Sequence, residues 1–201
     1  MKNKKLFLIA IIVTIGCCTF SVLSCTNNEK EKFNIGENFI PSGYMGCQQI
    51  ININTTDTTD PHSGLSCISI AINSWKGCGG VTWAGVYWQN KESNWGNKQG
   101  ENFSGKGFTK VTFWAKGQNG AEVVKFGSGG TIDNNMKYID SYNERNTTEG
   151  KNVILSKQWK QYVINLNGAD LSSVIGGFFF SVAENSNKDG LIFYLDDIIF
   201  E

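Results

Sequence analysis

The sequence has few of the residues on which several kinds of site depend. It contains one histidine, His62, and one arginine, Arg145. A zinc centre built from several histidines is therefore excluded, and so is a cluster of arginines that would hold phosphate groups. The 18 basic residues are balanced by 18 acidic residues, so the chain has no positive excess for binding nucleic acid. We expect no nucleic-acid partner.

Motifs for catalysis are also scarce. No glutamate is followed two positions later by aspartate, the spacing that would point two carboxylates to one face of a strand for glycoside hydrolysis. The adjacent Asp196 and Asp197 are expected to point to opposite faces of their strand, which makes them a poor acid and base pair. His62 lies in a turn sequence at 60–64, and the chain has no Gly-x-Ser-x-Gly motif around a serine. These absences favour a protein that is not an enzyme.

The first 25 residues resemble the processing signal of a bacterial lipoprotein. Three lysines at residues 1–5 precede an uncharged apolar run at 6–15, which is short for a membrane span. The segment ends in VLSC, which is similar to a lipobox, in which the cysteine is acylated and becomes the new N-terminus. We expect a signal peptide at 1–24, lipidation at Cys25, a tether at 25–38 and a location at the bacterial cell envelope. An ordinary secretory signal with a cysteine near the cut is the alternative.

Three cysteines remain after that cleavage. Cys47, Cys67 and Cys78 would then lie in an oxidising compartment, where disulfides persist. They allow one disulfide and one free thiol in any of three pairings, and three buried free thiols are an equal alternative. The sequence favours none of these arrangements.

Residues 39–201 have the patterning of one β-sheet domain. Short β-branched and aromatic runs alternate with Gly, Asn, Ser and Asp, and no window after residue 33 has the apolar spacing of an amphipathic helix. Strands are expected at 48–54, 66–73, 83–89, 109–116, 121–127, 152–155, 160–167, 175–183 and 191–200. Many short strands without crossover helices predict an antiparallel β-sandwich, and a barrel is the alternative.

Alternation within these strands separates inner from outer side chains. Ile68, Ile70 and Ile72 share one face, and an unbroken apolar set of this kind is expected in the core. The other sets expected to point inward are Val111, Phe113 and Ala115; Tyr162, Ile164 and Leu166; and Ala84, Val86 and Trp88.

The aromatic residues between these sets point to the opposite face. Trp83, Tyr87 and Gln89 share the outer side of one strand, and Trp114 lies on the polar side of another. Flat rings beside amide groups suit a sugar, whose C–H face stacks on a ring while its hydroxyls bond to polar neighbours. We therefore predict that Tyr87 and Trp114 bind sugar, with Gln89 as a hydrogen-bonding neighbour. Trp83 and Trp95 are expected as rim or platform rings, and the alternative is that loops cover these rings.

Several segments together resemble carbohydrate-binding modules with the galactose-binding-like jelly-roll fold. The matching segments are PHSG at 61–64, WAGVYWQ at 83–89, NWG at 94–96, FWAKG at 113–117, WKQY at 159–162, VIGGF at 174–178 and FYLDDIIF at 193–200. The resemblance covers roughly residues 39–201 and is specific as a set. It implies an all-β jelly roll that binds polysaccharide or glycan without catalysis.

The resemblance also implies a structural Ca²⁺. In such modules an aspartate of the last strand and oxygens of an early loop hold the ion, and oxygen ligands of this kind are what Ca²⁺ binds. On this chain the ligands would be Asp196 or Asp197, together with Asp60 or backbone carbonyls near residues 63–64.

The implied partners are a polysaccharide or glycan, the membrane through the lipid anchor alone, and glycan-degrading enzymes of the envelope. Two other functions remain open at this point. One is a jelly-roll glycan hydrolase or lyase, and the other is a structural or adhesive surface lipoprotein that binds protein.

Overall fold

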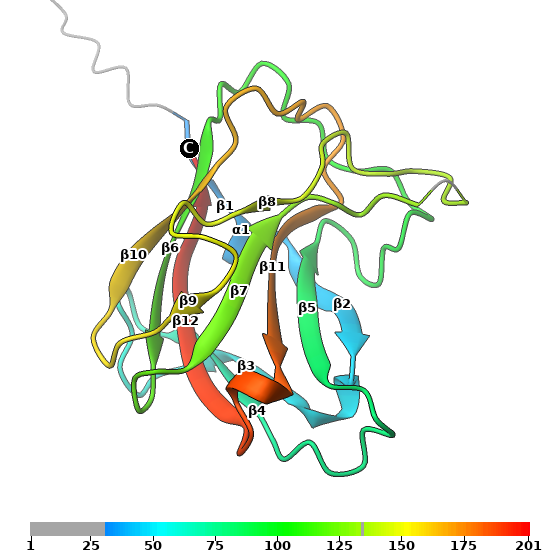
Figure 1. The fold of residues 1–201 in the computed structure, drawn as a ribbon. Coiled ribbons are helices and arrows are strands. Elements are labelled where there is room, and N and C mark those ends of the chain that lie inside the picture. Colours follow the sequence, from blue (N-terminus) through cyan, green and yellow to red (C-terminus); the bar gives the residue numbers. More distant parts are fainter. Residues whose placement is uncertain (1–30, 134) are drawn as a thin grey trace, which may run out of the picture.

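Two antiparallel sheets packed face to face form the described part of the chain (Figure 1). The computed structural model describes residues 31–133 and 135–201, so the expected signal peptide and Cys25 lie outside the described residues. Within those two ranges, no helix is long and apolar enough to cross a membrane. The antiparallel β-sandwich predicted from the sequence is confirmed.

Each sheet has six strands. In sheet A the order is β10 (Lys160–Asn165), β6 (Lys110–Gly117), β12 (Leu191–Phe200), β4 (Cys67–Ile72) and β3 (Ile51–Asp57), and β1 (Phe33–Asn34) also pairs with β12. In sheet B the order is β2 (Ile40–Gly46), β5 (Trp83–Gln89), β11 (Gly176–Ala183), β7 (Val123–Ser128) and β8 (Arg145–Asn146), and β9 (Val153–Ile154) also pairs with β7. The helices are one turn or shorter: α1 (Ile35–Asn38), η1 (Gln48–Ile50) and η2 (Glu184–Ser186).

The expected strands all have counterparts, and β5 and β12 have the predicted bounds. The sequence does not predict β2, whose residues IPSGYMG include one proline and two glycines. Such residues are depleted in strands, but β2 lies at the edge of sheet B, where proline is tolerated. Residues 48–50 were expected to begin a strand and instead form the 3₁₀ helix η1.

The sandwich begins before residue 39. Phe33 and Asn34 pair with Phe200 and Ile199 of β12, and Ile35 in α1 is fully buried. The side chain of Asn34 caps α1 by accepting a hydrogen bond from a backbone N–H in its first turn. Residues 33–38, which the sequence assigns to the tether, therefore belong to the folded domain.

The core lies between the sheets and consists largely of aromatic rings. The ring of Phe113 on β6 lies 4.9 Å from that of Phe126 on β7 and 4.9 Å from that of Phe178 on β11. One strand of sheet A thus contacts two strands of sheet B. All four inner sets expected from alternation are buried.

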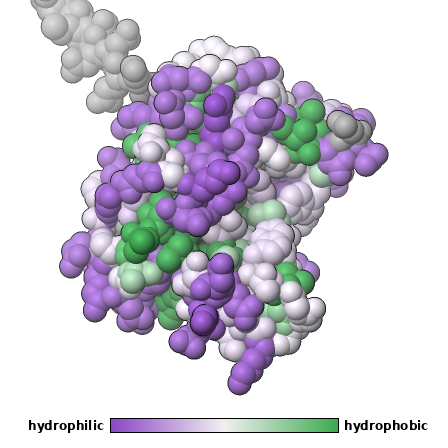
Figure 2. Space-filling view, viewed as in Figure 1, coloured by the Kyte–Doolittle hydropathy of each residue, from purple (hydrophilic) through white to green (hydrophobic). Residues whose placement is uncertain are grey.

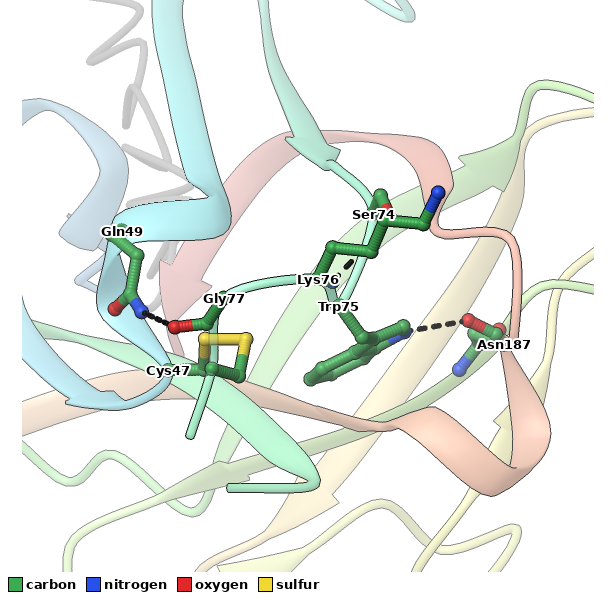
Figure 3. Close-up of a disulfide and its surroundings, with 8 residues drawn as sticks. Cys47, Gln49, Ser74, Trp75, Lys76, Gly77 and Asn187 are labelled. Carbon is green, nitrogen blue, oxygen red and sulfur yellow. Dashed lines mark hydrogen bonds between the residues drawn. A yellow bond between two sulfur atoms is a disulfide. The ribbon is translucent and has the colours of Figure 1, made fainter. Parts of the chain in front are cut away.

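A disulfide joins the segment after β2 to the loop between β4 and β5, at the end of the sandwich where β5 begins (Figure 3). Cys47 and Cys78 are bonded, with Cα atoms 5.5 Å apart, and Cys67 is left as a buried free thiol. Burial raises the pKa of the Cys67 thiol to about 11, which makes it a poor nucleophile. Close to the disulfide, Trp75 is buried and its indole N–H donates to the Asn187 carbonyl at 2.8 Å.

Candidate functional site

The predicted sugar-binding residues lie on two different sheets. Trp83, Tyr87 and Gln89 are on β5 in sheet B, whereas Trp114 is on β6 in sheet A. Their side chains leave the sandwich on opposite sides, because each strand turns its alternate residues into the shared core. The predicted platform of Tyr87 and Trp114 is therefore wrong as a single surface.

The outer face of sheet B, here called the sheet B face, contains an aromatic cluster at its upper end. The ring of Tyr87 lies 4.7 Å from that of Phe179 on β11 and meets the ring of Trp95 edge-on at 6.0 Å. Tyr87 and Phe179 are only 7% and 2% exposed. The Tyr87 hydroxyl donates to the Gly129 backbone carbonyl at 3.2 Å, and the Lys125 ammonium lies over the Phe179 ring. Trp95 is partly exposed. Tyr87 points outward as predicted, but it supports Trp95 and offers no free ring face.

Gln89 is fully buried at the same end of the face. Its side-chain N–H donates to the Asn94 carbonyl at 2.9 Å, and its carbonyl oxygen accepts a bond from the Ser42 hydroxyl at 3.1 Å. The predicted hydrogen bond from Gln89 to a sugar is thus replaced by bonds that fix the turn carrying Trp95.

The lower end of the sheet B face is open. Trp83, expected as a rim or platform ring, is 43% exposed. In the next row of the face, Gly85 pairs with Ser181 on β11 and with Met45 on β2, and Gly85 is buried with the Met45 side chain close to it. A Cβ atom on Gly85 would lie 2.6 Å from the Phe180 carbonyl oxygen, so this part of the floor accommodates no side chain. Figure 2, drawn in the same view as Figure 1, shows pale residues of intermediate hydropathy over the middle of this sheet.

Two hollows flank Trp83. One, of about 200 Å³, is lined by Trp83, Val123, Lys125, Asn152, Ser181, Val182, Ala183 and Ser186. The other, of about 490 Å³, is lined by Thr82, Trp83, Ala183, Glu184, Asn185 and Lys188. Amide and ammonium groups therefore stand on both sides of one exposed indole ring. Alternation could have pointed to Lys125, which faces outward on β7, but Asn152, Asn185 and Lys188 lie outside regular strands and carry no such signal.

Trp114 on sheet A is covered by the single histidine. The His62 ring stacks on the Trp114 ring with centroids 3.7 Å apart and an interplanar angle of 17°. Trp159 adds an edge contact to His62 at 6.0 Å. An imidazole thus occupies the place that a sugar ring would take on this platform.

The expected calcium ligands Asp196 and Asp197 both face the loop that carries His62. The backbone of Asp197 has a φ of +47°, and the pairing of β12 with β6 shifts register between residues 196 and 199. This bulge turns both carboxylates to one side, which corrects the expectation that they point to opposite faces. Asp196 accepts backbone bonds from His62 at 2.9 Å and Ser63 at 3.2 Å. Asp197 accepts a bond from the Ser63 hydroxyl at 2.7 Å and lies 2.8 Å from His62 Nδ1.

Asp60, the third expected ligand, is engaged elsewhere. Its carboxylate forms an ion pair with Lys116, whose ammonium also lies over the rings of Trp159 and Tyr194. Among the described residues, no three His, Cys, Asp or Glu side chains form a group that could hold a metal. Backbone N–H groups, the Ser63 hydroxyl, the His62 ring and a lysine contact these three carboxylates. Calcium binding by them stays a prediction.

Comparison with known proteins identifies the fold. No protein-family model matches the chain, and no curated protein matches its sequence. A family 30 carbohydrate-binding module has a TM-score of 0.56 and 16% identity, over 86% of this chain and 88% of that chain. The family 30 module of a cellulosomal cellulase from Clostridium thermocellum has a TM-score of 0.55 and 16% identity, over 85% and 97%.

A family 11 carbohydrate-binding module from Clostridium thermocellum is also similar. It was solved in complex with a β-1,3-1,4-mixed-linked tetrasaccharide and has a TM-score of 0.53 and 13% identity, over 84% of this chain and 93% of that chain. The chain therefore has the jelly-roll fold of these carbohydrate-binding modules, as the sequence resemblance implied.

Proposed function

We propose that this protein binds polysaccharide or glycan chains on the sheet B face. The observation that carries the proposal is the exposed Trp83 ring, which lies beside the row formed by Met45, Gly85 and Ser181. A pyranose stacks its C–H face on such a ring, and the amide and ammonium groups of the two hollows are placed to bond its hydroxyls. The mixed-linked glucan bound by the family 11 module is the first ligand to test.

We propose further that binding occurs without catalysis. Glycoside hydrolysis requires two carboxyl groups on either side of the scissile bond. Glu184 is the one carboxylate among the described residues that line the hollows flanking Trp83. The nearby Glu144 is paired with Lys125 at 2.7 Å. These contacts support a binding protein over a hydrolase or lyase.

Anchoring through Cys25 is part of the same proposal. The first described residues pair with the end of β12, since Phe33 lies opposite Phe200. Trp83 lies at the other end of the sandwich, where it pairs with Ala183 before the chain turns into β12. A lipid anchor at Cys25 would hold the Phe33 end near the membrane of the cell envelope. The open end of the sheet B face would then point outward, toward glycan and toward glycan-degrading partner enzymes.

The test is glycan binding by Trp83→Ala, measured by titration calorimetry with mixed-linked β-1,3-1,4-glucan. Loss of the stacking ring is expected to weaken binding about tenfold, equivalent to ~1.4 kcal/mol, with little change in melting temperature. Tyr44→Ala is the matched control, because Tyr44 is similarly exposed on the neighbouring β2 but pairs with the inward-facing Val86.

A second variant tests the floor of the face. Ser181→Leu would place a branched side chain over Gly85 and is expected to abolish binding while Trp83 remains intact. Normal affinity in both Trp83→Ala and Ser181→Leu would show that glycan does not bind on the sheet B face. Release of reducing sugar by the wild-type protein would contradict the non-catalytic part of the proposal.

A further inference from the structure

An ion pair lies at one margin of the sheet B face. Lys125 on β7 points outward, because Phe126 next to it is buried in the core. It pairs with Ser181 across β7 and β11, and it lines the smaller of the two hollows that flank Trp83. The Lys125 ammonium lies 2.7 Å from the carboxylate of Glu144. A partly exposed ion pair is therefore part of the proposed glycan site.

The Lys125 ammonium keeps hydrogen-bond donors for a ligand. Its side chain is 27% exposed, and the ammonium lies over the Phe179 ring, 5.5 Å from the ring centroid. An ammonium has three N–H donors, and Glu144 is its one carboxylate partner among the described residues. Two donors are left for oxygen atoms of a ligand in the hollow. A ligand that accepted these bonds would also lie close to Glu144.

The Glu144 carboxylate is directed toward the sheet B face. Glu144 directly precedes β8, the strand that pairs with β7. Burial is the main cause that raises the pKa of Tyr87, and the charge of Glu144 adds to it, so the carboxylate lies within electrostatic range of that ring. The following residue, Arg145, lines a separate hollow together with two aspartates, and Lys125 is not part of that hollow. Glu144 is thus the charge that determines the surroundings of Lys125.

The charges around Trp83 cancel. The smaller hollow has one charged lining residue, Lys125, and Glu144 balances its charge. The larger hollow has one ammonium, Lys188, and one carboxylate, Glu184. Uncharged hydroxyl groups can approach such a surface without electrostatic cost. A sugar carboxylate that reached Lys125 would lie beside the carboxylate of Glu144, and like charges placed together oppose binding.

We propose that Glu144 restricts the site to neutral polysaccharides by keeping acidic ones, such as polyuronates, away from Lys125. The inference rests on the proposed glycan site and adds the class of ligand that the site accepts. Two carboxylates about 5 Å apart at a protein surface repel each other by an energy equivalent to roughly tenfold in affinity. Without Glu144, the Lys125 ammonium is free to form a charge-assisted hydrogen bond with a sugar carboxylate. Glu144 is a specificity-determining residue that acts through its contact with Lys125.

The test compares binding of polygalacturonate and of mixed-linked β-1,3-1,4-glucan by titration calorimetry. In Glu144→Gln, which keeps the shape of the side chain without its charge, affinity for polygalacturonate is expected to rise about tenfold above that of the wild-type protein. The gain is expected to shrink when salt is raised to ~0.2 M, because exposed charges are screened. In Glu144→Gln/Lys125→Met the gain is expected to disappear, since methionine keeps an apolar chain over Phe179 without the ammonium.

Glu149→Gln is the matched control. Glu149 forms an exposed ion pair with Lys160 of β10, also at 2.7 Å, but on sheet A. The control changes the net charge of the whole protein by the same amount as Glu144→Gln, and its affinity for polygalacturonate is expected to equal that of the wild-type protein. An equal gain in both variants would show a general attraction of the polymer and would overturn the proposal.

Two further results would also overturn it. One is a wild-type protein that binds polygalacturonate as tightly as the neutral glucan, and the other is Glu144→Gln with no gain. A wild-type protein that binds neither polymer would contradict the proposed function instead. In that case the appearance of polygalacturonate binding in Glu144→Gln, and its absence in Glu149→Gln, still decides the role of Glu144.

Discussion

Removal of the Cys47–Cys78 disulfide should lower the free energy of unfolding, and the size of the loss depends on the number of residues between the two cysteines. The bond closes a loop with a sequence separation of 31, which contains β3, β4 and the loop that carries His62. Closing a loop of that length lowers the entropy of the unfolded chain by about 12 cal/mol/K, equivalent to ~3.7 kcal/mol at 25 °C. With an unfolding entropy of about 2.1 cal/mol/K per residue, a domain of roughly 170 residues should melt about 10 °C lower without the bond.

The assay is thermal unfolding followed by circular dichroism, with and without reductant. Cys47→Ala/Cys78→Ala should melt about 10 °C below the wild-type protein and should not respond to reductant. Cys67→Ala is the control, because Cys67 is a free buried thiol, and this variant should keep the full response to reductant. A response that disappears in Cys67→Ala would refute the pairing. A shift of less than about 3 °C in the double variant would refute the loop-entropy argument.

Three further predictions concern the anchor and sheet A. Cys25→Ala should move the protein from the membrane fraction to the soluble fraction, and equal membrane retention would contradict lipidation. The resemblance implies a structural Ca²⁺ at Asp196 or Asp197, so EDTA should lower the melting midpoint and Ca²⁺ should restore it; an unchanged midpoint would contradict the site. Trp114→Ala should lower the free energy of unfolding by about 2 kcal/mol, through loss of the His62 stack and of buried area, and should leave glycan affinity unchanged. Weaker glycan binding by this variant would show that Trp114 contributes to the binding surface.

Local periodicity was sufficient to predict most of the fold. The bounds of β5 and β12 follow from runs of alternating apolar residues, and the inner sets on both strands fill the core. β2 was missed because an edge strand tolerates proline and glycine, so its residues carry no strand signal. Alternation also failed at Asp196 and Asp197, where a bulge adds a residue and turns both side chains to one side. Aspartate tolerates the positive φ that this bulge requires at Asp197, but no local sequence pattern predicts the bulge.

The candidate site was less predictable, because exposure depends on loops. Alternation placed Trp83, Tyr87 and Gln89 on the correct side of β5. It could not show that the turn carrying Trp95 would bury Gln89 and bring the Trp95 ring against Tyr87. Nor could it show that Trp83 would stay exposed.

The two faces of the sandwich show why one aromatic residue becomes available for ligand and another does not. Trp83 and Trp114 both point outward from their strands, so alternation treats them alike. They differ in whether another segment of the chain packs over the ring. His62 reaches Trp114 because Asp196 and Asp197, more than 130 positions later in the chain, bind the backbone and side chains of residues 62 and 63. Among the described residues no aromatic or histidine ring stacks on Trp83, which is 43% exposed. The bulge in β12 gathers two carboxylates that hold His62 over Trp114, and the indole ring of Trp83 on the sheet B face has no such cover, which is why we propose that face as the binding surface.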